Sequence, residues 1–88
     1  MTVRHDNLSV DWLGYATTRL ESNRGTVIYT DPGRYGVLGS EYPKDGHLVV
    51  ITHNHHYDSA GITQVARSDA TVVVYAGVDT TQIDRDVT

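Results

Sequence analysis

The sequence contains no cysteine and no phenylalanine, has only one lysine, and has no long hydrophobic run. Without cysteine, neither a disulfide nor a thiolate metal site can form, so any metal ion must be held by histidine and carboxylate side chains. No run approaches the ~20 apolar residues of a transmembrane helix, and residues 1–6 lack the apolar segment of a signal peptide. We therefore expect a cytoplasmic protein with no membrane partner.

The charged residues are mostly acidic. Seven Lys and Arg residues against eleven Asp and Glu residues give a net charge of −4. A nucleic-acid-binding surface needs a basic patch, so we expect no nucleic-acid partner. The chain has 88 residues, which is enough for one domain, residues 1–88. A chain of this size buries only about 60–65% of its unfolded surface, so its core is small.

The pattern of residues 7–31 predicts an antiparallel β meander. Apolar and polar residues alternate over 8–12, as in a half-buried strand. Further strands are expected near 17–20 and over 26–30, where threonine and β-branched residues are frequent. Residues 22–25 separate them, and the asparagine and glycine of this segment suit the positive φ of a hairpin turn.

Trp12 is expected in the core, as the only tryptophan of the chain. Asp31-Pro32 should end the third strand, because proline cannot donate a hydrogen bond to a neighbouring strand. The glycine-rich residues 32–46 are then expected to form a loop beside a functional site.

Residues 47–77 have the order of a βαβ unit. The apolar run 48–51 predicts a strand that is buried on both faces. A short helix is expected from a serine or aspartate cap near residue 59 to about Arg67, and a buried strand over 70–75. Residues 78–88 are polar and are expected to form a tail or a frayed helix.

A cluster of polar residues follows the apolar run 48–51. His53, His55, His56 and Asp58 lie at the carboxyl end of the expected strand, where ligands of open α/β sheets bind. Two histidines two residues apart point to the same side of an extended chain and can chelate a divalent ion at about 2.0–2.1 Å. Imidazole and carboxylate donors suit Zn²⁺ best here, with Mn²⁺ or Fe²⁺ as alternatives.

This cluster resembles the ligand motif of the metallo-β-lactamase-fold hydrolases, T-H-x-H-x-D-H-x-G-G, which corresponds without a gap to residues 52–61. Residues 12–16, Trp-Leu-Gly-Tyr-Ala, resemble the W-L-G-H-A segment of the ascorbate-6-phosphate lactonase-like branch. Residues 27–32 resemble the strand of that branch that ends in Asp-Pro. The resemblance implies an α/β fold, the N-terminal half of an αββα sandwich.

The resemblance also implies site residues. His53 and His55 fall on the first two metal-ligand histidines of the family. In the gap-free alignment the motif aspartate falls on Tyr57 and the next histidine on Asp58. A one-residue insertion would instead make Asp58 the aspartate ligand and put Ser59 in the place of the histidine. Under either alignment that histidine is missing, which favours a mononuclear or altered site.

Asp58 is therefore our candidate catalytic residue as well as a ligand, since a carboxylate beside the ion can position it. Asp31, His56 and Tyr57 are candidates for a supporting role around the ligands. For Asp31, the alternative is an ordinary strand-end aspartate before a proline turn. His5 and His47 are expected to be surface histidines.

The resemblance implies a metal-dependent hydrolase of an ester, lactone or phosphoester, in which a metal-bound water is activated. No histidine follows His56, although family members take further ligands from later segments. We therefore expect the site to be incomplete and this chain alone to be inactive. The alternative is a non-catalytic half-domain that binds metal or another protein, with homo-oligomers forming through an exposed sheet edge.

Overall fold

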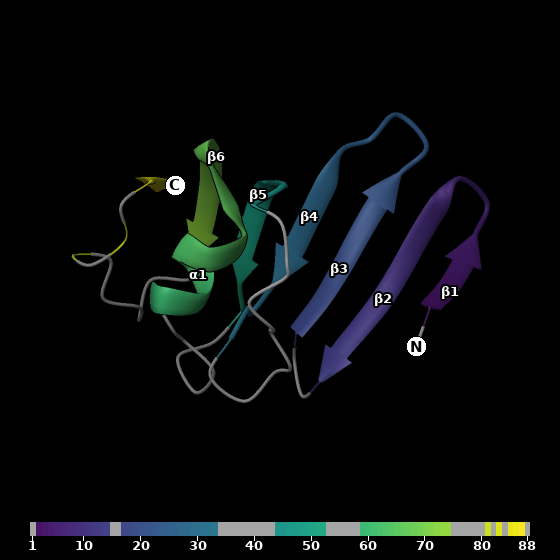
Figure 1. Ribbon diagram of the computed structural model, residues 1–88, viewed down its shortest axis with the longest axis horizontal. Coiled ribbons are helices and arrows are strands. Elements are labelled where there is room, and N and C mark those ends of the chain that lie inside the picture. The colour runs from purple at the N-terminus through teal and green to yellow at the C-terminus, as the bar shows by residue number, and fades with distance from the viewer. Residues whose placement is uncertain are drawn as a thin grey trace.

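The computed structural model describes residues 2–14, 17–33, 44–52, 59–74, 81, 83 and 85–87. These residues form one seven-stranded mixed sheet and one short helix, and the strands follow one another in the sheet in sequence order (Figure 1). The elements are β1 (Thr2–His5), β2 (Leu8–Gly14), β3 (Thr17–Ser22), β4 (Val27–Thr30), β5 (Gly46–Ile51), α1 (Ser59–Val65), β6 (Ala66–Val74) and β7 (Asp86–Val87). In this part of the chain, no helix has the length and hydrophobicity needed to cross a membrane.

The first four strands are antiparallel. The three strands expected from the sequence are present, and β1 adds a fourth that the polar N-terminus did not suggest. Asp6 takes a positive φ of 52° in the two-residue turn between β1 and β2. Between β3 and β4, Gly25 takes a positive φ of 86°, whereas Asn23 does not. Glycine alone therefore provides the left-handed residue of that turn.

The later strands are parallel: β5 pairs with β4, β6 with β5, and β7 with β6. The expected βαβ unit is formed by β5, α1 and β6, but the helix ends at Val65 instead of about Arg67. The chain enters β6 at once, because Ala66 pairs with Gly46. A seven-residue helix has little stability of its own, so strand pairing decides where it ends.

The prediction of a tail or frayed helix for the last residues is wrong at Asp86–Val87, which pair with Thr71 and Val72 as β7. Arg85 precedes this strand and donates hydrogen bonds to two backbone carbonyls, at 3.0 Å to Ala66 and 2.8 Å to Arg67. These bonds attach the polar segment to β6, an effect that the composition of the segment does not reveal.

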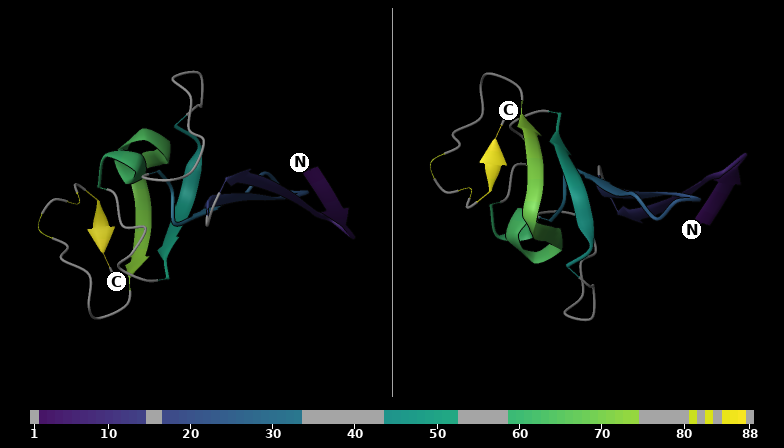
Figure 2. Two further views of the ribbon diagram at one scale, coloured as in Figure 1. Left: turned by 90° about the horizontal axis from the view of Figure 1, so that it is seen from below. Right: turned by 90° about the horizontal axis from the view of Figure 1, so that it is seen from above.

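The two faces of the sheet differ. Helix α1 covers one face over β5 and β6, and the sheet is strongly twisted between β1–β3 and β5–β6 (Figure 2). The core lies between this face and the helix. It consists of Val27, Tyr29, Val49, Ile51, Ile62, Val65, Ala66, Ala70 and Val72.

The other face has no helix among the described residues, and two predictions fail there. Trp12, expected in the core, is 52% exposed. Strand β5, expected to be buried on both faces, buries Val49 and Ile51 but leaves Leu48 and Val50 half-buried. With a single seven-residue helix, the described part is mostly β-sheet, so the expected α/β class overstates its helix content.

Candidate functional site

The candidate site is at the carboxyl ends of the neighbouring parallel strands β4 and β5. The proposed ligands and their neighbours, His53, His55, His56, Tyr57 and Asp58, lie outside the described residues. The structure does describe Asp31, the sixth candidate, and the residues that flank the ligand segment on both sides. It therefore shows how these two flanks are fixed.

Asp31 follows β4 directly, is only 2% exposed, and uses all four of its polar atoms. Its carboxylate accepts hydrogen bonds from the backbone N–H of Thr52 at 2.9 Å and from the Thr52 hydroxyl at 2.6 Å. Its own N–H donates to the carbonyl of Val50 at 2.9 Å, and its carbonyl accepts from the hydroxyl of Thr17 at 2.7 Å. Asp31 thus joins β3, β4 and the end of β5 immediately before His53.

The backbone of Asp31 is strained. Its φ of 44° lies in the left-handed region, which costs a residue other than glycine of the order of 1–3 kcal/mol. Aspartate and asparagine tolerate this conformation better than other residues. The four hydrogen bonds offset that cost, and the conformation turns the carboxylate toward Thr52. Asp31 therefore does more than end a strand before a proline: it fixes the backbone of Thr52, from which the segment of proposed ligands starts.

The other flank of the ligand segment contacts the same turn. Gly61 lies in α1, and a Cβ atom on it would be 2.4 Å from the carbonyl oxygen of Pro32 and 2.8 Å from the Cα of Gly33. Only glycine allows so close an approach of two backbones. The turn at residues 31–33 therefore contacts the chain on both sides of residues 53–58, at Thr52 through a carboxylate and at Gly61 through backbone packing.

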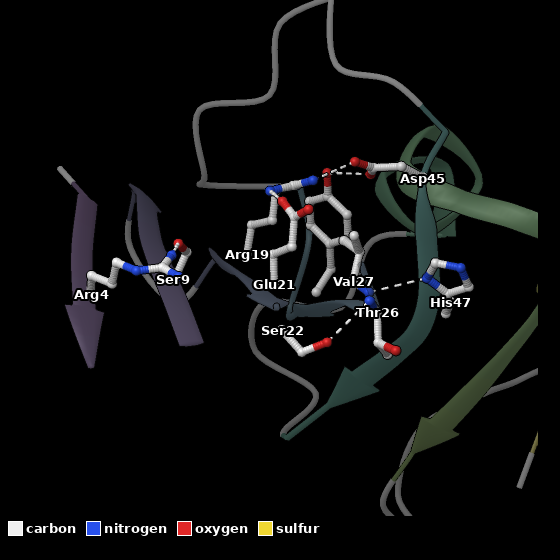
Figure 3. A network of polar contacts seen from close by, with 10 residues as sticks. Arg4, Ser9, Arg19, Glu21, Ser22, Thr26, Val27, Asp45 and His47 are labelled. Carbon is white, nitrogen blue, oxygen red and sulfur yellow. Dashed lines mark hydrogen bonds and ion pairs between the residues drawn. The ribbon is translucent and has the colours of Figure 1, made fainter. Parts of the chain in front are cut away.

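A second polar cluster lies at the opposite end of the β4–β5 pair (Figure 3). Asp45 accepts a hydrogen bond from the Tyr29 hydroxyl at 2.8 Å and forms an ion pair with Arg19 at 2.6 Å. Arg19 also pairs with Glu21 at 2.9 Å, and its guanidinium lies 6.0 Å from the centre of the Tyr29 ring. His47, exposed as expected, accepts a hydrogen bond from the N–H of Val27 at 3.0 Å.

The pKa values of Arg19 and Tyr29 are both raised within this cluster. Partial burial by itself would lower the pKa of Arg19, but hydrogen bonds to Asp45 and Glu21 outweigh it and raise that pKa. Burial raises the pKa of the Tyr29 hydroxyl, and its hydrogen bond to Asp45 raises it further. Both groups thus keep their protons at neutral pH, and each is already paired with a carboxylate. The cluster stabilises the fold and is not a candidate for catalysis.

Within the described residues, no three histidine, aspartate or glutamate side chains lie close enough together to bind a metal ion. The histidines of the motif therefore remain the candidate donors. Sequence reasoning missed the role of Thr17, which gives no signal beyond its place in a β-rich segment. The contact of Thr52 with Asp31 was also missed, although both residues belong to segments that resemble the family.

The mixed sheet, with one helix between two parallel strands and ligand-type residues after β5, is consistent with part of a metallo-β-lactamase fold. Residues 9–87 match the family model described as "Beta-lactamase superfamily domain", and the chain therefore belongs to that superfamily. Comparisons with curated proteins and with solved structures gave no significant match.

Proposed function

We propose that this chain binds a divalent metal ion through His53, His55 and Asp58 and belongs to a metal-dependent hydrolase lineage. The observation that supports this best is the contact of the Asp31 carboxylate with Thr52, which fixes the backbone one residue before His53. Ending a strand with a buried carboxylate in a strained backbone conformation is energetically unfavourable. Backbone strain of this kind is concentrated at functional sites.

The donor set fits such an ion. Imidazole nitrogen and carboxylate oxygen suit Zn²⁺, and also Mn²⁺ or Fe²⁺, and the chain has no cysteine to favour a thiolate site. When bound, the ion would supply a water with a lowered pKa for attack on an ester, lactone or phosphoester. The contribution of the described residues is positional: Asp31 orients the start of the ligand segment, and Gly61 lets α1 contact the turn. His56 and Tyr57 are proposed to support the ligands.

The lactonase-like branch is the proposed relative, since Trp12, Asp31 and Pro32 lie in the segments that resemble it. The second candidate is a non-catalytic module that binds metal or a protein. It is favoured by the apolar face of the sheet that no described helix covers, on which Trp12 is 52% exposed. The two candidates share the metal ligands and differ in turnover.

Metal content after purification tests the ligand assignment. We expect the chain to bind zinc, and the double variant His53→Ala/His55→Ala to lose it. The control is His5→Ala, which removes an exposed histidine from the distant strand β1. Equal zinc content in the wild type and the double variant would show that the ligands are wrongly assigned.

Hydrolysis of lactone and phosphodiester substrates with added Zn²⁺ or Mn²⁺ then separates the two candidates. Turnover that is lost in His53→Ala supports the hydrolase. Because no histidine follows His56, we expect negligible turnover from this chain. Zinc binding that depends on His53 without turnover would show that the chain is not catalytic by itself, and it is compatible with a hydrolase lineage.

A further inference from the structure

Among the described residues, only two polar residues are buried, and they contact each other. Thr17, the first residue of β3, is 1% exposed, and Asp31 is 2% exposed. The Thr17 hydroxyl donates a hydrogen bond to the backbone carbonyl of Asp31 at 2.7 Å. A buried polar group without a partner is destabilising, so each of these two groups depends on the other at the point where β4 ends.

The Thr17 hydroxyl replaces a backbone partner at this point. Strands β3 and β4 pair as far as Thr18 with Thr30, so the next pair in register would be Thr17 with Asp31. The positive φ of Asp31, 44°, turns its backbone out of the strand, and the pairing ends. The carbonyl of Asp31 belongs to the peptide bond with Pro32, whose nitrogen carries no hydrogen. It is therefore the only hydrogen-bonding group of that peptide unit, and Thr17 is its partner.

The backbone of Asp31 is thereby held on both sides of its Cα atom. Its N–H donates to the carbonyl of Val50 at 2.9 Å, and its carbonyl accepts from Thr17. One bond orients the peptide before Asp31 and the other orients the peptide after it. Together they maintain a φ that residues other than glycine rarely adopt. In this conformation the carboxylate holds Thr52 by two hydrogen bonds, of 2.9 and 2.6 Å.

We propose that Thr17 is a positioning residue of the metal site and acts through the backbone of Asp31. This role rests on the proposed function, in which the ligand segment begins at His53. Without the hydroxyl, the buried carbonyl of Asp31 loses its partner, and the backbone can relax to an extended conformation without strain. The carboxylate then turns away from Thr52, and the backbone one residue before His53 is no longer fixed.

Two adjacent threonines of β3 allow a matched comparison. Thr17→Val removes the hydroxyl that holds Asp31 and keeps the shape of the side chain. Thr18→Val removes a hydroxyl that hydrogen-bonds to the Thr30 hydroxyl, one pair earlier in the same two strands. Thr17→Ser keeps the hydroxyl and should behave as the wild type. Circular dichroism verifies folding, and if Thr17→Val does not fold, Thr17→Ala removes the hydroxyl without placing a methyl group against the carbonyl.

Hydrogen exchange of the metal-free chain measures the link between Thr17 and Thr52. The Thr52 amide donates to the Asp31 carboxylate, and local opening sets the exchange rate of such an amide, so it should exchange on the order of tenfold faster in Thr17→Val than in Thr18→Val. Thr17→Ser should protect this amide as the wild type does. Equal exchange rates of the Thr52 amide in Thr17→Val and Thr18→Val would overturn the proposal.

Zinc affinity, measured by isothermal titration, tests whether the effect reaches the ligands. Thr17→Val should weaken zinc binding by about tenfold, the lower end of the effect of groups that orient metal ligands. Thr18→Val and Thr17→Ser should bind zinc as the wild type does. In an Asp31→Ala background, Thr17→Val should cause no further loss, because residues that act through one another are not additive. A full additional loss in that background would overturn the route through Asp31.

The ligand assignment and the role of Thr17 fail on different results. Equal zinc content in the wild type and in His53→Ala/His55→Ala would overturn the ligand assignment, and the exchange rate of the Thr52 amide would still decide whether Thr17 fixes that backbone. Zinc binding that depends on both histidines but is unchanged in Thr17→Val would overturn the role of Thr17 alone.

Discussion

The two ends of the β4–β5 pair are built from the same kinds of residue but behave differently. Each end has an aspartate that joins neighbouring strands, Asp45 at the amino end and Asp31 at the carboxyl end. Each end also has a glycine in close contact with another segment, Gly46 and Gly61 respectively. The difference lies in the groups that the two carboxylates contact.

The carboxylate of Asp45 forms an ion pair with Arg19 at 2.6 Å. Arg19 also pairs with Glu21, and the Tyr29 hydroxyl donates its hydrogen bond to Asp45. The carboxylate of Asp31 is held by two neutral donors of Thr52 and belongs to a residue with a strained φ of 44°. A paired carboxylate in an unstrained turn contributes to stability alone. A carboxylate that turns out of its strand to hold the backbone of Thr52 also fixes the residue from which the next segment starts, and here the next segment carries the proposed ligands.

The largest effect that would distinguish the two ends is expected from Gly61→Ala. Its Cβ would be 2.4–2.8 Å from three backbone atoms of Pro32 and Gly33, which cannot move without displacing Asp31. We expect a loss of at least about 3 kcal/mol in the free energy of unfolding, at the upper end of overpacking effects. Urea denaturation followed by circular dichroism measures it.

Gly46→Ala is the control at the amino end. Its Cβ would lie 2.9 Å from the Val65 carbonyl and 3.0 Å from the Tyr29 ring, a milder conflict that should cost about 1–3 kcal/mol. If Gly61→Ala is tolerated as well as Gly46→Ala, the turn at residues 31–33 is not held against α1 as described.

The next largest effect compares the aspartates themselves. Asp31→Ala and Asp45→Ala each remove hydrogen bonds to a charged group, worth about 1.5–3 kcal/mol, so both should lower the free energy of unfolding by a similar amount. Only Asp31→Ala should also weaken zinc binding, by about 10–100-fold, as removal of groups that orient metal ligands does. Isothermal titration with zinc, at a temperature where both variants are folded, distinguishes them. Equal zinc affinities would reduce Asp31 to a structural residue.

The comparison of the two ends shows which structural features can be predicted from the sequence and which cannot. The meander, the parallel β5–β6 pair and the short helix follow from local patterns: alternation over 8–12, the apolar run 48–51, and proline after Asp31. The role of Asp31 could be suggested from its place before Pro32. Its four hydrogen bonds could not, because they depend on Thr17 and Val50, which are distant in sequence.

The failed predictions have a common physical cause. Trp12 and the strand at 48–51 were expected to be buried because their residues are apolar, but hydrophobicity reports only a tendency to be buried. Whether a second layer covers them depends on tertiary structure, and the described part supplies one helix on one face. The boundary at Val65 was missed for a similar reason, since pairing of Ala66 with Gly46 ends the helix.

A smaller effect concerns pH at the amino end. The pKa of Tyr29 is raised in the folded protein by burial and by Asp45, so folded Tyr29 keeps its proton when unfolded tyrosine, with a pKa of about 10, has lost it. Its contribution to stability is complete below that pH and is lost as pH rises above it. Tyr29→Phe should therefore make the free energy of unfolding fall less steeply between neutral and strongly alkaline pH. Identical pH profiles would contradict the hydrogen bond to Asp45.

The smallest effect is expected from Asp69→Asn, which removes an exposed ion pair on β6, outside the β4–β5 pair. A hydrogen bond from Arg67, at 3.1 Å, lowers the pKa of Asp69, so any stability it contributes is present at neutral pH and lost in acid. Both side chains are largely exposed, at 47% and 72%, and exposed ion pairs are screened by water and salt. We expect no measurable change in unfolding at neutral pH, whereas Asp45→Asn, made beside the partly buried Arg19, should be destabilising. Equal losses in the free energy of unfolding would show that partial burial does not make the Arg19–Asp45 pair more stabilising than the exposed Arg67–Asp69 pair. The conclusion that the cluster at the amino end serves stability would then be wrong.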